Sequence, residues 1–311
     1  MSGHRVAAID CGTNSVRLLI AEQVAGGPVV DVVRQMRIVR LGQGVDRTGR
    51  LAAQAIERTR LALAEYADLI RAHPVGAIRM VATSATRDAA NREEFVAMVR
   101  ASLGIEPEVI SGRDEAQLSF AGATAGFTGL VEPLLLADIG GGSTEVVLGA
   151  ATRLQAHSMD IGCVRLTERR LLDDPPTRAQ LRAARDDIDA AIAAAVDPNL
   201  GGVALDRAAT FIGVAGTVTT MTAIVLGLPE YSSAAIHGAR MTAAQVSELT
   251  EQLVRMTHAD RAALPVIHPG RVDVITAGAL VLDALMHASG AATVIASERD
   301  ILDGIAASLL P

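Results

Sequence analysis

The sequence contains no lysine and no tryptophan, and only 2% of its 311 residues are aromatic. A phosphate-binding loop of the Gly-x-x-x-x-Gly-Lys-Ser/Thr type is excluded, because that loop uses its lysine to contact the phosphates. The scarcity of aromatic rings removes the stacking surfaces on which single-stranded nucleic acids and nucleobases usually bind. If this protein binds phosphate, it must use arginine side chains, backbone N–H groups and a metal ion.

Cysteine and long apolar runs are also scarce. The two cysteines, Cys11 and Cys163, form neither a disulfide framework nor a zinc site, so we expect two reduced packing residues. No apolar stretch reaches the roughly 18 residues that a membrane span needs, and no signal-peptide pattern opens the chain. The net charge of −7 disfavours binding to nucleic acid or to an anionic membrane. These absences predict a cytoplasmic protein that binds neither.

The pattern of apolar residues predicts an α/β fold in two parts. Three strand-like segments open each part, within residues 6–41 and 134–160, and helices then alternate with strands. Helices are expected over 51–71, 91–103, 178–196, 243–256, 272–289 and 300–310, and the later strands over 77–82, 108–110, 211–215 and 292–296. A chain of this length fits two domains of about 100 to 200 residues each. Small residues near Ala125 suit a boundary, which gives domains 1–125 and 126–311.

Two segments about 128 residues apart have the same form: an apolar run, an aspartate and a glycine-containing polar turn. The aspartates are Asp10 and Asp138. The turns contain Gly12, Thr13, Asn14 and Ser15 in the first copy and Gly140, Gly141, Gly142, Ser143 and Thr144 in the second. Each apolar run predicts a buried strand that enters a tight turn, where backbone N–H groups can close on an anion. Two such turns facing each other would bind a phosphate from both sides.

These motifs resemble the two phosphate loops of the actin, sugar-kinase and heat-shock ATPase superfamily. More narrowly, the chain resembles the exopolyphosphatase and guanosine pentaphosphate phosphohydrolase (Ppx/GppA) family, and the similarity continues through 82–91, 110–116, 160–168, 213–219, 270–273 and 297–304. The resemblance implies two actin-like (ribonuclease H-like) α/β domains with an active-site cleft between them. It also implies an enzyme that hydrolyses the terminal phosphate of inorganic polyphosphate and releases orthophosphate. Longer members carry further helical domains that this chain lacks, so we expect a preference for short chains.

Three acidic residues of the motifs are predicted to bind a metal ion. Carboxylates repel a neighbouring phosphate unless a cation intervenes, so Asp10, Asp138 and Glu145 fit direct or water-mediated ligands of Mg²⁺, with Mn²⁺ as a substitute. The resemblance implies the same set. Helix capping or turn stabilisation is the alternative for the two aspartates, and a solvated strand position is the alternative for Glu145.

Hydrolysis also needs a base that reaches a water molecule in line with the leaving phosphate. The resemblance implies that this base is Glu115, the acid of a Ser-Gly-x-x-Glu-Ala motif. The alternative is that Asp114 and Glu115 only favour a helix N-terminus electrostatically. Arg17 and Arg87 are the best candidates among the arginines for phosphate contacts, because guanidinium groups match phosphate oxygens. A structural ion pair is the alternative for each arginine.

Other functions stay open at this stage. Guanosine pentaphosphate (pppGpp), a nucleotide of the stringent response, is an alternative substrate, as are other nucleoside polyphosphates. A kinase that moves phosphate from ATP to a sugar or acetate shares the two loops, and Glu115 is the residue that separates hydrolysis from it. A nucleotide- or alarmone-binding module is a third function. The segment 213–217 fits either a nucleoside site or a close packing turn, and a homodimer also stays open.

Overall fold

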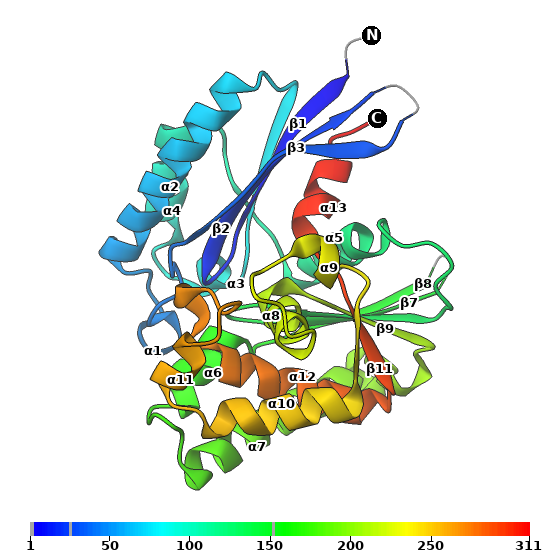
Figure 1. Ribbon diagram of the computed structural model, residues 1–311. Coiled ribbons are helices and arrows are strands. Elements are labelled where there is room, and N and C mark those ends of the chain that lie inside the picture. The colour runs from blue at the N-terminus through cyan, green and yellow to red at the C-terminus, as the bar shows by residue number, and fades with distance from the viewer. Residues whose placement is uncertain (1–2, 25–26, 151–152) are drawn as a thin grey trace. The chain divides into compact units, whose positions relative to one another are not determined.

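The structure is a computed structural model of the chain, and it describes residues 3–24, 27–150 and 153–311 (Figure 1). The chain divides into two compact units. Unit 1 comprises residues 1–122 and 301–311, and unit 2 comprises residues 123–300. No helix in the described part of the chain has both the length and the apolar character needed to cross a bilayer.

Unit 1 is built on a five-stranded sheet of order β3-β2-β1-β4-β5. The strands β1, β2 and β3 form an antiparallel meander, and β4 and β5 run parallel to β1. The strands are β1 (His4–Cys11), β2 (Ser15–Gln23), β3 (Val29–Ile38), β4 (Ala77–Ala82) and β5 (Glu108–Val109). The helices are α1 (Val45–Thr48), α2 (Ala53–Ala72), α3 (Ser84–Asp88), α4 (Arg92–Leu103), α5 (Gly112–Thr124) and α13 (Ile301–Ala307).

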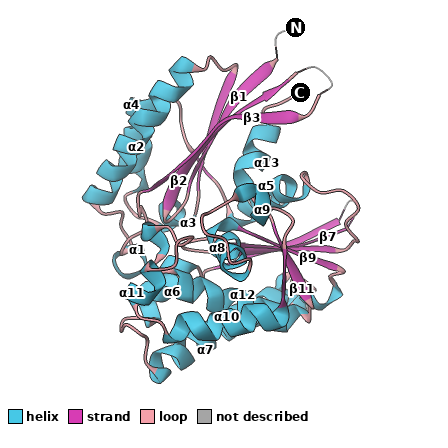
Figure 2. Ribbon diagram, in the orientation of Figure 1, coloured by secondary structure: helices cyan, strands magenta, loops and turns pink. Residues whose placement is uncertain are grey.

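Unit 2 is built on a six-stranded sheet of order β10-β11-β9-β6-β7-β8. The strands are β6 (Leu134–Ile139), β7 (Thr144–Ala150), β8 (Arg153–Met159), β9 (Thr210–Val214), β10 (Arg240–Thr242) and β11 (Thr293–Ala296). The helices are α6 (Cys163–Arg170), α7 (Arg178–Val196), α8 (Ala215–Val225), α9 (Ser233–Ile236), α10 (Ala243–Arg255), α11 (His258–Ala262) and α12 (Ile275–Ser289). Figure 2 shows α7, α10 and α12 on one side of these strands.

The two sheets repeat one plan. In each, an antiparallel meander (β1-β2-β3 and β6-β7-β8) is followed by two strands parallel to its first strand, β4 and β5 in unit 1 and β9 and β11 in unit 2. The sheet of unit 2 adds an edge strand, β10, which is antiparallel to β11. The predicted α/β fold in two parts is therefore confirmed. The repetition also puts the two motif turns in equivalent places, between the first and second strands of each sheet.

Period-two alternation in unit 1 explains how one sheet is covered on both faces. Ile9 and Leu18 face the core beneath α2 and α4, whereas Val6 and Leu19 face a smaller core that contains Ile305 of α13. Figure 1 shows α2 and α4 on one side of these strands and α13 on the other. Because both faces bury apolar side chains, the strands read as continuous hydrophobic runs.

The last residues of the chain belong to unit 1, whereas the sequence predicts them in the second domain, 126–311. The boundary after the first stretch of unit 1 lies at Gly122/Ala123, near Ala125. Helix α13 supplies one wall of the smaller unit 1 core, and it approaches α5 closely at Gly304. A Cβ at Gly304 would lie 2.0 Å from the carbonyl oxygen of Leu118. Sequence periodicity identifies the helix but does not reveal which sheet it covers.

Candidate active site

The first motif turn joins β1 to β2. Gly12 N donates to Ser15 O (2.9 Å), which closes the turn, and the carbonyl of Thr13 accepts from Gly42 N (2.8 Å). The hydroxyls of Thr13 and Ser84 share a hydrogen bond of 2.9 Å, which ties the turn to the first residue of α3. The turn is therefore fixed from two sides by residues of its own unit.

The second motif turn joins β6 to β7 and is closed by the same hydrogen bond, here from Gly140 N to Ser143 O (3.1 Å). Helix α6 begins behind the turn. Cys163 N donates to Gly140 O (2.9 Å), Val164 N donates to Gly141 O (2.8 Å), and Arg165 Nε donates to Gly142 O (2.6 Å). Three consecutive carbonyls of the turn are thus satisfied by α6.

The N–H groups of this second turn differ from its carbonyls in their hydrogen bonding. Within the part of the chain that the structure describes, the N–H groups of Gly141, Gly142 and Ser143 donate to no acceptor. Successive backbone N–H groups without an internal acceptor form a ready site for an anion. Thr144 does not add a donor to this set, because its buried hydroxyl donates to Ile161 O (2.6 Å). This geometry favours a structural role for the Thr144 side chain, which the sequence predicts to bind phosphate.

Strand register determines what faces each motif aspartate. Across β1 and β2, Asp10 lies opposite Arg17, and across β6 and β7, Asp138 lies opposite Glu145. In unit 1 the pair is an ion pair, since Arg17 Nη2 and Nε donate to Asp10 Oδ2 at 2.7 and 3.0 Å. In unit 2 the equivalent position brings two buried carboxylates to facing positions, and Ser158 Oγ donates to Glu145 Oε1 (2.7 Å).

The two facing carboxylates of unit 2 are the part of the structure that best fits a magnesium ion. Like charges directly opposite each other on neighbouring strands are unfavourable, and a cation between them offsets that cost. Mg²⁺ usually takes one or two protein carboxylates and completes its shell with water and phosphate oxygens. Among the described residues, no group of three or more His, Cys, Asp or Glu side chains is arranged to hold a metal. The structure therefore brings Asp138 and Glu145 together, while the third predicted ligand, Asp10, lies in unit 1 beside Arg17.

Glu115 lies in the first turn of α5 and is buried. Its Oε2 accepts from Arg87 Nη1 (3.0 Å), and the same nitrogen donates to Ile110 O (3.1 Å). Asp114 is exposed and accepts from Ser111 Oγ (2.6 Å), whose oxygen in turn accepts from Asp114 N (3.2 Å). The two adjacent acids thus have different surroundings. Asp114 takes part in capping the helix, and Glu115 is held by an arginine.

The comparisons with known proteins identify the family of this chain. The Ppx/GppA phosphatase family matches residues 19–311. The chain belongs to this family. Exopolyphosphatase 2 of Mycobacterium tuberculosis (strain H37Rv) is 49% identical to it over 317 residues, which cover 98% of each chain. The crystal structure of an exopolyphosphatase-like protein superposes with a TM-score of 0.92 at 44% identity, covering 99% of this chain and 98% of that one. The Aquifex aeolicus family member gives a TM-score of 0.82 at 30% identity, with 99% and 97% covered.

The comparisons confirm the Ppx/GppA family, the α/β fold and the enzyme class, a phosphatase, that the sequence predicts. The roles of individual residues stay predictions. Sequence reasoning missed Ser158, which bonds to Glu145. Arg165 lies within the segment 160–168 that carries the family resemblance, and it supports the glycine-rich turn through Gly142 O.

The β9–α8 turn of this Ppx/GppA phosphatase is a tightly packed junction. Ala215 has a positive φ of 66°, which costs energy in a residue with a Cβ. A Cβ at Gly213 would lie 2.8 Å from Val218, and one at Gly216 would lie 1.0 Å from Nη1 of Arg271. For the segment 213–217 the sequence allows a nucleoside site or a close packing turn, and this geometry favours the close packing turn.

The cysteines behave as predicted. Both are buried and free. Burial raises the pKa of Cys163 to about 11 and raises the pKa of Cys11 as well. Both are therefore thiols and not thiolates at neutral pH.

Gly162→Ala tests the close support behind the second turn. A Cβ at Gly162 would lie 2.6 Å from the carbonyl carbon of Gly141 and 2.7 Å from Gly142 N. Because these are backbone atoms, the turn itself must move. We expect a loss of about 1–3 kcal/mol in unfolding free energy and a fall in kcat/KM of about tenfold or more, since the N–H groups are displaced. Thermal denaturation and phosphate release would measure the two effects.

Gly76→Ala is the matched control for this substitution. Its new Cβ would meet nothing closer than Arg5 O at 3.7 Å, an ordinary contact. The stability change should stay within about 0.5 kcal/mol. An equal loss in the two variants, or no loss in Gly162→Ala, would show that the turn is not held in place by this contact.

Proposed function

We propose that this protein is an Mg²⁺-dependent exopolyphosphatase that removes the terminal phosphate of inorganic polyphosphate as orthophosphate. The observation that carries the proposal is the second turn. In the described part of the chain, three consecutive N–H groups without an internal acceptor, those of residues 141–143, lie between one carboxylate, Asp138, and another, Glu145, that faces it across the two strands. A polyphosphate end requires donors for its oxygens and a cation for its charge. The printed name of the 49% identical relative, an exopolyphosphatase, supports the same substrate.

In the proposed reaction each group of residues has a separate role. Gly141, Gly142 and Ser143 bind the oxygens of the terminal phosphate. Asp138 and Glu145 would hold Mg²⁺, which would supply positive charge to offset that of the phosphate. Glu115 accepts a proton from the attacking water, whose oxygen bonds to phosphorus as the anhydride bond breaks. The shortened polyphosphate leaves with the electron pair of that bond.

Arg87 positions the base in this scheme. Its guanidinium contacts both the Glu115 carboxylate and the carbonyl of Ile110, so it fixes where Glu115 points. A guanidinium beside a carboxylate stabilises the ionised form, which is the form that can accept a proton. Arg17 forms the corresponding ion pair with Asp10 and stabilises its ionised form in the same way.

A panel of substrates tests the proposed function. Orthophosphate release would be measured with polyphosphates of defined chain length, with pppGpp, and with ATP in the presence and absence of a sugar or acetate. We expect the highest kcat/KM for polyphosphate, with short chains favoured. Faster release from pppGpp would reassign the substrate. Phosphate transfer from ATP to an added acceptor, without release, would reassign the enzyme as a kinase.

The cytoplasmic location stays a prediction from the sequence, and cell fractionation tests it.

Arg87→Ala should raise the KM for polyphosphate, flatten its dependence on salt and lower kcat. Contacts between guanidinium and phosphate are screened over about 8 Å at physiological ionic strength, so losing one leaves fewer screened contacts. The fall in kcat follows from the lost contact with Glu115. The measurement is kcat and KM against NaCl concentration.

Arg92→Ala serves as the control, because Arg92 is exposed on α4 and only approaches Glu93 at 3.7 Å. A fall in kcat with an unchanged salt slope in Arg87→Ala would show that Arg87 acts through Glu115 and contacts no phosphate.

A further inference from the structure

A pocket of about 650 Å³ opens in unit 2 between α7, α10 and the loop that precedes α7. Neither the glycine-rich turn nor the carboxylate pair lines it. Its charged lining consists of four arginines and one acid: Arg178, Arg182, Arg185, Arg255 and Glu251. The whole chain has a net charge of −7, so this concentration of positive charge runs against the overall composition. Such a local reversal of sign attracts anions.

Three of the arginines form a row on one face of α7. Arg178, Arg182 and Arg185 are spaced i, i+4 and i+7, which places them above one another on a helix. The row is roughly 10 Å long, from a rise of 1.5 Å per residue. Arg255 faces the row from α10 across Glu251, which accepts from Arg185 (2.8 Å) and from Arg255 (3.3 Å). A single carboxylate therefore serves two of the four guanidinium groups.

The other two arginines have no such partner. Among the residues that the structure describes, none forms an ion pair or hydrogen bond with the side chain of Arg178 or Arg182. Arg178 is also the first residue of α7, where the helix dipole disfavours a positive charge. Like charges at i, i+3 and i, i+4 along the row disfavour the helix further. A bound anion would offset all of these costs.

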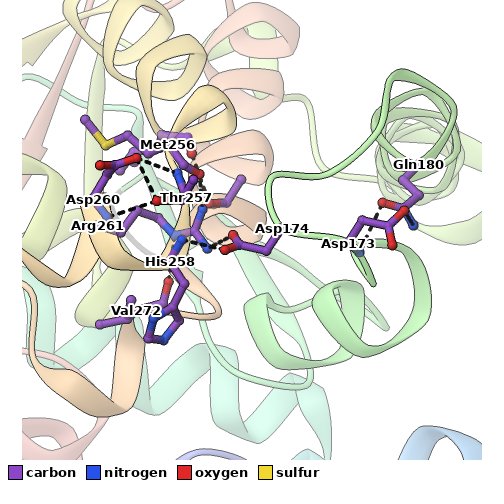
Figure 3. Close-up of polar contacts among 11 residues, drawn as sticks. Asp173, Asp174, Gln180, Met256, Thr257, His258, Asp260, Arg261 and Val272 are labelled. Atoms are coloured by element: carbon purple, nitrogen blue, oxygen red, sulfur yellow. Dashed lines mark hydrogen bonds and ion pairs between the residues drawn. The ribbon is translucent and has the colours of Figure 1, made fainter.

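The wall of the pocket that carries Pro175 and Pro176 is held in place on both sides. Figure 3 shows the preceding residue, Asp174, directed at Arg261 and His258, with Asp173 beside Gln180. Asp174 accepts from His258 N (2.6 Å) and from Arg261 Nη2 (2.8 Å). These contacts, the first above all, hold the pKa of Asp174 below its usual value, so the Asp174 carboxylate is ionised at neutral pH.

The residues that hold Asp173 and Asp174 are themselves fixed by further hydrogen bonds. Arg261 is buried and also donates to Met256 O (2.7 Å) and Val272 O (2.9 Å). Gln180 Nε2 donates to Asp173 Oδ2 (3.0 Å), and its Oε1 accepts from Thr177 N (3.1 Å). A wall that is already ordered loses little conformational entropy when a ligand binds.

We propose that this pocket is a second polyphosphate site, which binds a chain of several linked phosphates without hydrolysing it. The proposal rests on the proposed function for the nature of the substrate. A row roughly 10 Å long matches an extended polyanion better than a single phosphate ion. Among the described residues, no aromatic side chain lines the pocket, which argues against a nucleotide, because a base would find no stacking surface there. Guanidinium groups donate in the fork geometry that phosphate oxygens accept.

The double variant Arg178→Glu/Arg182→Glu tests the site. Calorimetric titration of the full chain with tripolyphosphate, in chelator so that turnover is suppressed, should show one binding event fewer than the wild type. The ratio of the KM for a long chain to that for tripolyphosphate should rise roughly tenfold. A glutamate at position 178 suits the helix N-terminus, whereas the double variant keeps a like-charge pair at i, i+4, so the ligand-free variant should melt at about the same temperature as the wild type. Loss of binding would therefore not reflect misfolding.

Arg207→Glu/Arg240→Glu is the charge-matched control. Both arginines are exposed in unit 2 and lie outside the pocket, so binding and the KM ratio should match the wild type. Unchanged titration of the Arg178/Arg182 variant would overturn the proposal. Binding of orthophosphate or of a poly-glutamate peptide as tightly as polyphosphate would overturn the ligand class. Binding at this site without any orthophosphate release by the active enzyme would contradict the proposed function alone.

Discussion

Glu115→Gln should reduce the turnover of polyphosphate by about 100-fold or more and leave its binding intact. The amide has the same shape as the carboxylate but accepts no proton from water at neutral pH. Its oxygen can still accept from Arg87 Nη1, which contacts Glu115 Oε2 at 3.0 Å, so the local geometry should persist. Steady-state phosphate release gives kcat, and titration of the slow variant with polyphosphate in the presence of Mg²⁺ gives its affinity, which is compared with the KM of the wild type.

Asp114→Asn is the matched control for this prediction. Asp114 is the adjacent acid, but it is exposed and bonded to Ser111 at the helix N-terminus. We expect its turnover to stay within a factor of about two and its stability to fall by less than about 1 kcal/mol. Near-normal turnover in Glu115→Gln would remove the assigned role. A similar loss in both variants would indicate that the negative charge of the helix N-terminus matters and that no single base does.

Some elements could be predicted from the sequence to the residue. Helix α7 begins and ends where its periodicity predicts, at Arg178 and Val196. Its start is marked by a capping box, in which the side chains and backbones of Thr177 and Gln180 bond reciprocally. Strand β4 also matches its predicted bounds, 77–82, because it is a short apolar run with turn residues before it.

The short helices α3 and α6 were not predicted from the sequence, for a physical reason. Helix α6 has eight residues and α3 has five, so neither completes enough turns to show an apolar period. Yet both support the motif turns, α6 behind Gly140 and α3 through Ser84. Residues 272–274, predicted to be helical, precede α12, because a 3-10 turn over Pro269–Arg271 ends just before them.

The candidate residues of the site were predictable, but most of their pairings were not. The sequence does not reveal that Arg87 bonds to Glu115, since they come from different helices. The strand pairs carried a usable signal. Arg17 and Glu145 each lie seven residues after a motif aspartate, so two hairpins with the same turn length put them in equivalent positions. That comparison alone shows that one copy pairs the aspartate with an arginine and the other with a second acid.

The pairing of Asp138 with a second acid, Glu145, leads to the prediction for metal removal. Chelation with EDTA should abolish phosphate release, and added Mg²⁺ or Mn²⁺ should restore it, because a polyphosphate end cannot approach Asp138 and Glu145 without a cation. Full activity in chelator would contradict the metal site. Activity alone does not identify the ligands, however, so the three predicted acids must be separated by a second measurement.

Thermal denaturation with and without Mg²⁺ provides that measurement. Mg²⁺ at saturating concentration should raise the Tm of the wild type, because a ligand that binds only the folded state stabilises it. Asp138→Asn and Glu145→Gln should lose this rise, and Glu145→Gln can keep its bond from Ser158 through the amide oxygen. Asp10→Asn should keep the rise but lower the Tm in every condition, because it removes the negative charge of the ion pair with Arg17. If Asp10→Asn also abolished the Mg²⁺ effect, the metal would depend on carboxylates from both units and the two-ligand assignment would fail.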